Sequence, residues 1–288
     1  MTSTLPRPTR SGPRASSPIA RQRSTSSRPD LRFEKTLLRR GYVRLAAMDE
    51  VGRGALAGPV SVGVVVVTPS IGRVPAGLRD SKLLTPAARD ALVGPVRRWV
   101  REYGVGHASA DEIDAIGIMS ALRLAARRAL EHLTGPVDAV LLDGNHDYLN
   151  PRPVAPDPDQ EPLFAPEPAP PLVPVHLKIK ADLTCAAVAG ASVLAKTERD
   201  RHLVELSPLH PRYNFAVNKG YGTPDHLAAL REHGPSEVHR RSWRLGLAAT
   251  GDVDAAADPT ADRADGAGYS GAMEDEDRSD WKGEGYPT

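Results

Sequence analysis

Two neighbouring acids, Asp49 and Glu50, stand at the end of an apolar run and are followed at once by a glycine-rich turn, residues 52–59 (GRGALAGP). Carboxylate oxygens are hard ligands of the kind that Mg²⁺ and Mn²⁺ prefer. Glycines allow backbone N–H groups to approach a sugar or a phosphate closely. The two acids and the turn therefore suit the task of holding a divalent metal ion against a phosphodiester, although many short motifs of this kind are only solvated surface turns.

Two further acids stand at places where ligands often gather. Asp143 follows a short apolar run, residues 140–142, and precedes Gly144. In open α/β folds, ligands bind at the carboxyl ends of the strands, where this acid would lie. Asp182 stands just before a stretch rich in Ala and Gly. Aspartate is a preferred N-cap of helices, so Asp182 can be a cap or a metal ligand, and the two roles do not exclude each other.

Four carboxylates that converge without a cation repel one another, and some of them are forced to take up protons. Two divalent ions would balance their charge, which makes a paired-metal site for phosphoryl transfer physically sensible. One difficulty is that neighbours on a strand point to opposite faces, so Asp49 and Glu50 should diverge. We therefore expect the strand to end or bulge at Glu50, so that the turn brings both acids to one rim.

The elements that must position these acids alternate between strands and helices. The hydrophobic pattern predicts that the first two strands form a hairpin around the glycine turn and that helices separate the later strands. This order favours an α/β layer fold with a mixed sheet. The expected strands are 42–49, 61–68, 105–109, 139–142 and 175–179, and the expected helices are 86–102, 111–133, 183–206 and 225–233.

The two ends and one internal segment have compositions that do not support a packed core. Residues 1–30 hold six arginines and one acid among many Ser, Thr and Pro, and residues 252–288 hold eleven acids and three bases. Residues 151–174 contain ten of the 27 prolines. We expect both ends to be disordered and the proline-rich segment to be an extended insertion. An organelle transit peptide is the alternative for the basic arm, but its repeated prolines interrupt an amphipathic helix.

The sequence contains no run of 18 apolar residues and no apolar core of a secretion signal. Cys185 is the single cysteine, which excludes an intramolecular disulfide and a cysteine-based zinc site. These features predict a cytoplasmic protein that is not attached to a membrane.

Six motifs, in order, resemble the ribonuclease HII family of prokaryotic type. They are MDEVGRGALAGPV, DSKLL, LLDGN, KADLT with AGASVLAKTERD, NKGYGTPDH and EHGPSEVHRRSW. The likeness covers residues 40–246 and leaves out only the two ends and the proline-rich insertion. It implies a ribonuclease H-like fold with a central mixed five-stranded sheet, flanking helices and a small C-terminal helical segment. The implied organisation is a basic arm at 1–35, a catalytic domain at 36–250 and an acidic tail at 251–288.

The resemblance also implies an activity that depends on Mn²⁺ or Mg²⁺, with two ions during catalysis. The substrates would be RNA–DNA hybrids and duplex DNA with single embedded ribonucleotides, cut 5′ of the ribonucleotide to leave 3′-hydroxyl and 5′-phosphate ends. The chain would act as a monomer without a membrane, and no protein partner is implied. By matching position, the site acids are Asp49, Glu50, Asp143 and Asp182. Asp200 competes for the fourth place, but it lies about five helical turns from Asp182, so we favour Asp182.

The family's motifs also imply contacts to the substrate. Gly52, Arg53 and Gly54 match the element whose backbone contacts the ribonucleotide's 2′-hydroxyl group, which distinguishes RNA from DNA. Tyr221 matches a tyrosine that stacks on the sugar beside the junction. The candidates for phosphate contacts are Lys82, Lys196, Arg199 and Lys219. For the basic motif of residues 239–241 the resemblance leaves two roles open, contact to the nucleic-acid backbone or local packing.

Three other interpretations compete with this one. The sister family ribonuclease HIII usually has Lys where Arg53 stands and a folded N-terminal substrate-binding domain, for which the first 35 residues are too short and too polar. A non-catalytic nucleic-acid-binding module would not need all four acids. A nucleotide-phosphate-binding protein would need a phosphate-binding motif such as GxxxxGK[ST], which the sequence lacks.

Overall fold

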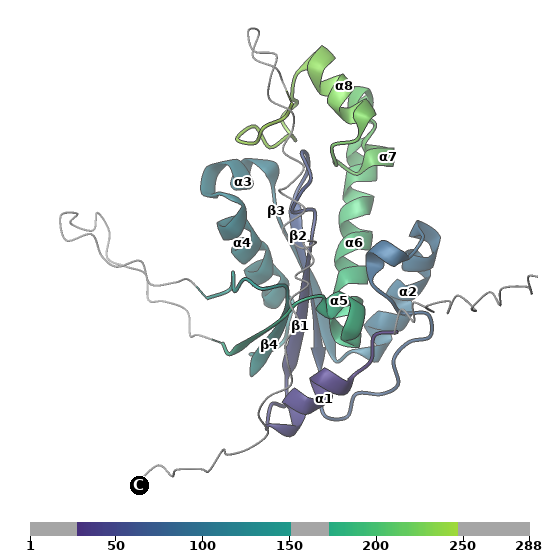
Figure 1. Cartoon of the computed structure of the whole chain (residues 1–288), viewed down its shortest axis with the longest axis vertical. Coiled ribbons are helices and arrows are strands. Elements are labelled where there is room, and N and C mark those ends of the chain that lie inside the picture. Colours follow the sequence, from purple (N-terminus) through teal and green to yellow (C-terminus); the bar gives the residue numbers. More distant parts are fainter. Residues whose placement is uncertain (1–27, 151–172, 247–288) are drawn as a thin grey trace, which may run out of the picture.

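A computed structural model describes residues 28–150 and 173–246 (Figure 1). Most of the basic arm, nearly all of the proline-rich insertion and the acidic tail lie outside the described residues, so the expectations about them stay predictions. The domain boundary expected at residue 35 falls inside a helix, α1 (Arg32–Arg39), which the hydrophobic pattern did not predict. Within the described residues, no helix is both long enough and apolar enough to cross a membrane.

The centre of the fold is a mixed five-stranded sheet, as expected. Its strand order is β3-β2-β1-β4-β5. β2 is antiparallel to both β1 and β3, whereas β4 is parallel to β1 and β5 is parallel to β4. The strands are β1 (Leu45–Val51), β2 (Val60–Val67), β3 (Glu102–Ala108), β4 (Ala139–Asp143) and β5 (Val175–Lys178).

Helices cover both faces of the sheet, and for this reason all eight residues of β2 are buried. On one face lie α2 (Pro86–Trp99) and α6 (Ala186–Leu206), and on the other lies α4 (Ile118–Glu131), preceded by α3 (Ala110–Ile116) (Figure 1). The small residues of α6 let it lie close to the sheet: a Cβ atom at Gly63 would come within 2.4 Å of the Ala191 carbonyl oxygen.

Two of the predicted helices are each divided in two. Gly117, with φ of +75°, separates α3 from α4, because glycine readily adopts the positive φ that ends a helix. The helix expected from residue 183 is preceded by a short one, α5 (Ala181–Thr184), and α6 begins only after Cys185. Asp182 lies within the first turn of α5, so its predicted role as the N-cap of the long helix is wrong.

The C-terminal segment forms a small unit that packs on the end of α6 and on the glycine turn (Figure 1). It contains α7 (Phe215–Asn218) and α8 (Pro224–His233). Ala57 of the turn and Leu203 of α6 share one apolar cluster with Tyr213, Phe215 and Leu230. The expected C-terminal helical segment is therefore confirmed, and it buttresses the turn that follows Asp49 and Glu50.

Candidate active site

Asp49 and Asp143 stand at the carboxyl ends of two neighbouring parallel strands, β1 and β4. Met48 of β1 pairs with Leu142 of β4, so Asp49 and Asp143 follow at the same level of the sheet. A third acid, Asp182, belongs to α5. The Ala181 N–H of this helix donates a 2.6 Å hydrogen bond to Asp143 Oδ1. Because Asp182 is the next residue, this bond ties the short helix to the end of β4.

The strand neither ends nor bulges at Glu50, so that expectation is wrong. β1 continues to Val51 in regular register, with Glu50 opposite Val62. The side chains of Asp49 and Glu50 therefore leave opposite faces of the strand. Both are still close enough to Asp143 for its charge to raise their pKa values. The pairing of β1 with β4 ends at Met48 and Leu142, just before Asp49 and Asp143.

The four acids, which we call the acidic rim (Asp49, Glu50, Asp143 and Asp182), all have raised pKa values. Burial is the largest cause for each. The charges of Glu50, Asp143 and Asp182 raise the pKa of Asp49 further, against a hydrogen bond from Ser192. The pKa of Glu50 is raised to about 7 and that of Asp182 to about 6. Excess negative charge at a partly buried site favours a bound cation.

Two buried oxygen atoms beside the acidic rim have no hydrogen-bond partner among the described residues, Glu50 Oε2 and the Tyr148 hydroxyl. Burial and the charges of Glu50, Asp49 and Asp143 raise the pKa of Tyr148 well above its ordinary value. A buried carboxylate oxygen without a partner is costly, and a bound cation would satisfy it. Tyr148 was not predicted from the sequence, because nothing in its local sequence marks it and only the fold brings it to the acids.

The donor set fits a hard divalent ion in chemistry, but the side chains are not drawn tightly together. Across residues 28–150 and 173–246, no three carboxyl, imidazole or thiol groups form a ready-made metal site. Mutual repulsion keeps such carboxylates apart when no cation lies between them.

Two basic side chains border the acidic rim. Arg53 Nη1 lies 3.7 Å from Glu50 Oε1. Burial works to lower the pKa of Lys82, but the charges of Asp49 and Asp182 outweigh it, and the pKa is raised. The structure thus places both predicted substrate contacts, Arg53 and Lys82, next to the acids.

Arg199 is not available for a phosphate contact, which corrects the prediction. It is completely buried, and its guanidinium group donates to the carbonyl oxygens of Pro59 (2.9 Å), Lys219 (3.0 Å) and Ala57 (3.2 Å). A positive charge in the family motif was interpreted as a surface group, whereas here it stabilises the glycine turn from inside.

A second buried arginine holds the start of the same turn. Arg240 donates to the carbonyl oxygens of Gly52 (2.6 Å), Arg53 (2.8 Å) and Gly58 (3.2 Å). The backbone N–H groups of residues 52–54 have no hydrogen-bond partner within the described chain. For Arg240 the structure thus decides between the two roles left open: it is a packing residue.

The glycines at either end of this tripeptide differ. Gly52 has φ of +85°, and a Cβ atom there would come within 2.0 Å of Arg199 Nε, so the fold requires glycine. At Gly54 a Cβ atom would meet nothing within 4 Å. The packing of the protein therefore does not require glycine at position 54.

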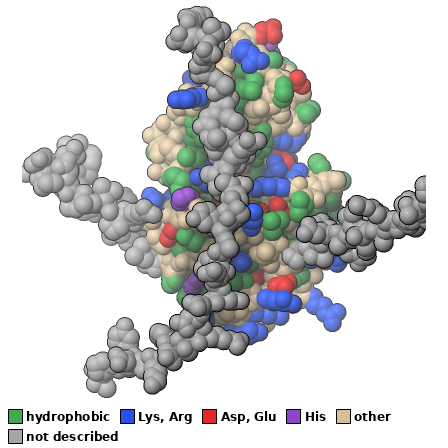
Figure 2. Space-filling model, viewed as in Figure 1, with side chains coloured by type: hydrophobic (Ala, Val, Ile, Leu, Met, Phe, Trp, Pro, Cys, Tyr) green, Lys and Arg blue, Asp and Glu red, His purple; other side chains and the backbone are tan. Residues whose placement is uncertain are grey.

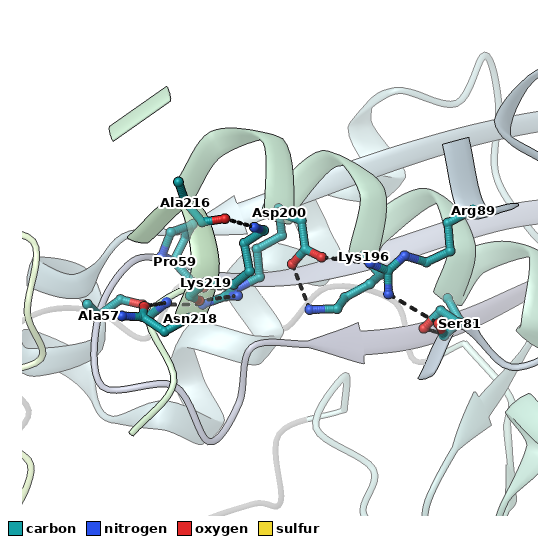
Figure 3. A network of polar contacts seen from close by, with 12 residues as sticks. Ala57, Pro59, Ser81, Arg89, Lys196, Asp200, Ala216, Asn218 and Lys219 are labelled. Atoms are coloured by element: carbon teal, nitrogen blue, oxygen red, sulfur yellow. Dashed lines mark hydrogen bonds and ion pairs between the residues drawn. The ribbon is translucent and has the colours of Figure 1, made fainter. Parts of the chain in front are cut away.

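The remaining predicted phosphate contacts already have partners in the protein. Lys196 Nζ lies 2.6 Å from Asp200 Oδ1, and Arg89 Nη2 lies 3.0 Å from Asp200 Oδ2 (Figure 3). Lys219 Nζ donates to the carbonyl oxygen of Ala216. Asp200, the competitor for the fourth acidic place, is therefore neutralised by two cations away from the acidic rim.

Tyr221 is half-buried between the turn and α6. The Nζ atom of Lys196 and the Cζ atom of Arg199 each lie 5.2 Å from the centre of its ring. Its carbonyl oxygen accepts a hydrogen bond from His226 Nδ1 at 2.8 Å. The ring thus has a fixed position next to the glycine turn.

A mixed five-stranded sheet with acids at the carboxyl ends of its adjacent parallel strands defines a ribonuclease H-like fold. Solved structures share it. The ribonuclease H2 of Pyrococcus horikoshii covers 71% of this chain and 95% of its own, with 24% identity and a TM-score of 0.52. The ribonuclease HII of Archaeoglobus fulgidus, solved in a complex with PCNA, covers 70% of this chain and 96% of its own, with 22% identity and a TM-score of 0.53.

Sequence comparison identifies the family. The family model described as Ribonuclease HII matches residues 46–245. The ribonuclease HII of Streptomyces avermitilis is 48% identical over 199 residues, which are 69% of this chain and 76% of the relative. That of Chloroflexus aggregans is 40% identical over 219 residues, which are 75% and 93% of the two chains. The chain belongs to the ribonuclease HII family and is a ribonuclease H that acts on RNA–DNA.

Proposed function

We propose that this ribonuclease H depends on divalent metal ions and nicks duplex DNA on the 5′ side of a single embedded ribonucleotide, besides cutting RNA in hybrids. The ends left would be a 3′-hydroxyl and a 5′-phosphate. The observation that carries the proposal is the acidic rim: four carboxylates with raised pKa values, one with an unpartnered buried oxygen, beside a rigid glycine turn. We expect the enzyme to work as a monomer in the cytoplasm.

Asp49, Glu50, Asp143 and Asp182 would hold Mn²⁺ or Mg²⁺. Two such ions, when bound, supply activation of the attacking water and charge stabilisation at the leaving 3′ oxygen. The chain's own groups prepare this arrangement. The Ala181 N–H donates to Asp143 Oδ1 and so orients this carboxylate.

Arg53 and Lys82 would bind the phosphates next to the scissile bond. Both lie beside the acids, and their positive charges would attract a substrate phosphate there. Neutralising phosphates with such groups makes binding dependent on salt concentration.

The tripeptide Gly52–Gly54 would recognise the ribose. Arg240 and Arg199 donate hydrogen bonds from the interior to carbonyl groups of the turn. The N–H groups of the tripeptide have no partner in the described chain. These donors and the open space above Gly54 suit close contact with a 2′-hydroxyl group. Tyr221 would stack on the neighbouring sugar.

The test is incubation of the protein with a DNA duplex that holds one ribonucleotide, with Mn²⁺ present or chelated. We expect a nick 5′ of the ribonucleotide that requires the ion. The control substrate is the same duplex with deoxyribonucleotides only. Equal cutting of both duplexes would contradict recognition of the 2′-hydroxyl group, and cutting in excess chelator would contradict the role of the acidic rim.

A further inference from the structure

Three segments far apart in sequence meet at the glycine turn: the turn itself (52–59), the loop that carries Tyr221 (218–223) and residues 236–240. Backbone hydrogen bonds join the turn to each of the other two. The Leu56 N–H donates to the Gly220 carbonyl at 2.8 Å, and the Gly58 N–H donates to the Val238 carbonyl at 2.8 Å. The turn thus lies between the other two segments.

The two outer segments are connected to each other by a pair of buried histidines, His226 and His239. Both are completely inaccessible to solvent, and their Nε2 atoms are 3.0 Å apart. His226 Nδ1 lies 2.8 Å from the Tyr221 carbonyl oxygen, and His239 Nδ1 lies 3.0 Å from the Ser236 backbone nitrogen.

These partners determine where the protons are. A carbonyl oxygen only accepts, so His226 carries its proton on Nδ1, and its Nε2 is an acceptor. A backbone N–H only donates, so His239 Nδ1 is an acceptor, and the proton of His239 is on Nε2. The Nε2–H of His239 therefore donates to Nε2 of His226. Every ring nitrogen has a partner in this arrangement, and in no other arrangement of two neutral rings.

We propose that this pair, the histidine latch (His226 and His239), holds Tyr221 in register with the glycine turn and so positions the enzyme for a single ribonucleotide. The inference rests on the proposed function, since it assigns the latch to the recognition of the ribose. Both histidines are positioning residues: His226 contacts the Tyr221 backbone, His239 contacts His226, and neither belongs to the acidic rim.

The packing around the latch makes the position of Tyr221 sensitive to it. Gly220 has φ of +82°, and a Cβ atom there would lie 2.4 Å from the Ala57 carbonyl oxygen, so the loop rests directly on the turn. Burial lowers the pKa of His239 to about 4, and it also lowers the pKa of His226. Both rings stay neutral near neutral pH, as the hydrogen bond requires.

Two substitutions of His239 distinguish the hydrogen bond of the latch from a role that depends only on side-chain packing. In His239→Gln the amide nitrogen takes the place of Nε2 and can still donate to His226. In His239→Asn the amide oxygen takes the place of Nδ1, keeps the Ser236 N–H as a donor and loses His226. His226→Asn also loses the link while its amide still donates to the Tyr221 carbonyl, so it repeats the test if His239→Asn does not fold.

The measurement is the ratio of kcat/KM on a duplex with one ribonucleotide to kcat/KM on a continuous RNA–DNA hybrid. A hybrid offers a 2′-hydroxyl at every position of the RNA strand, so it tolerates a shifted loop, whereas a single ribonucleotide does not. We expect His239→Asn to lower this ratio about tenfold, the scale of a small misplacement in a site. His239→Gln should retain it. Equal ratios in the wild type and His239→Asn, or equal losses in both variants, would overturn the proposal.

A second readout does not involve activity. In ¹⁵N-histidine-labelled protein near neutral pH, long-range proton–nitrogen NMR spectra should show His226 protonated on Nδ1 and His239 protonated on Nε2. The Nε2–H tautomer at both residues, or a charged ring at either, would overturn the latch. A wild-type enzyme that cuts hybrids but not single ribonucleotides would instead overturn the proposed function and the latch's role in selectivity, even with both tautomers as expected.

Discussion

The acidic rim and the underside of the glycine turn are neighbours with opposite electrostatic designs. The rim gathers four carboxylates of one sign, all with raised pKa values, and leaves Glu50 Oε2 without a partner. Under the turn, two buried arginines, Arg199 and Arg240, donate hydrogen bonds to carbonyl oxygens, and we call this pair the arginine clamp. Figure 2 shows acidic and basic side chains side by side on the described surface of one face.

The arginine clamp maintains the geometry of the glycine turn, whereas the acidic rim is the region proposed to bind metal ions. Burial, and then the charge of Arg199, lower the pKa of Arg240 to about 9, which still leaves it charged at neutral pH. A buried polar network in which every donor has an acceptor is rigid and specific. In the acidic rim one buried oxygen, Glu50 Oε2, has no partner among the described residues, and a bound cation would supply one.

The largest effect is expected from a substitution in the acidic rim. Asp143→Asn removes one negative ligand, and we expect cleavage of an RNA–DNA hybrid to fall by about 10³-fold, because several kcal/mol of metal-dependent charge stabilisation are lost. The fold should be retained, since Asn keeps an acceptor for the Ala181 N–H. Hybrid cleavage in the presence of Mn²⁺ is the measurement, with circular dichroism as the control for folding. A variant with more than a tenth of wild-type activity would remove Asp143 from the site.

The next largest effect should come from the arginine clamp. Arg240→Lys cannot reach the carbonyl groups of Gly52, Arg53 and Gly58 together, so we expect a loss of about 3 kcal/mol in the free energy of unfolding. Arg241→Lys is the matched control, because the Arg241 side chain is exposed, and it should cost less than about 0.5 kcal/mol. Urea unfolding without metal measures both. Similar losses in the two variants would mean that the clamp does not stabilise the fold.

The two regions should respond to pH in opposite directions when no metal is present. Raised carboxyl pKa values, about 7 for Glu50 and about 6 for Asp182, give stability at low pH that is lost as the pH rises through those values. The lowered pKa of His239, about 4, gives the reverse: stability is lost as the pH falls from 6.5 toward 4.

We therefore expect Glu50→Gln to raise the melting temperature of the metal-free protein at pH 8 by about 2–4 °C, with little change at pH 5. Thermal melting in chelator at both values of pH is the measurement. Added Mn²⁺ should stabilise the wild type more than Glu50→Gln, because a bound ion stabilises only the state that holds it. A lower melting temperature for Glu50→Gln at pH 8 would show that its charge is not repelled.

The smallest effect on stability is expected at Gly54. Its Cβ position is empty, so Gly54→Ala should change the free energy of unfolding by less than about 0.5 kcal/mol. The same methyl group would occupy the space proposed for the ribose, and we expect cleavage at a single ribonucleotide to weaken. Gly52→Ala provides the contrast, because its Cβ atom meets Arg199 and the variant should lose stability. Unimpaired cleavage by Gly54→Ala would separate Gly54 from substrate recognition.

Sequence patterns predicted much of the framework. Asp143 was expected at the carboxyl end of a buried strand and lies there, because apolar runs bounded by turn residues mark buried strands. The helix predicted for 111–133 is interrupted at Gly117 in the structure. The sequence pattern missed this interruption because the hydrophobic periodicity continues across Gly117 and does not show that the chain turns there. Patterning records which residues are buried, and it does not record changes in chain direction.

The site residues illustrate the same limit. Arg199 and Lys82 are both basic residues in family motifs, yet one is buried under the turn and the other borders the acids. Tyr148 and His226 had no role assigned from the sequence, because a hydroxyl or a ring nitrogen gains its significance from the partner across the fold.

By itself, the sequence determined the membership in the family and the mixed sheet, since these follow from residue types and local spacing, and it proposed the four acids. The tertiary structure alone decided which charges lie at the surface beside the acids and which stabilise the interior. The physical reason is that burial and hydrogen-bond partners set the behaviour of a charged group, and those partners come from segments such as 52–59, 218–223 and 236–240, which only folding brings together.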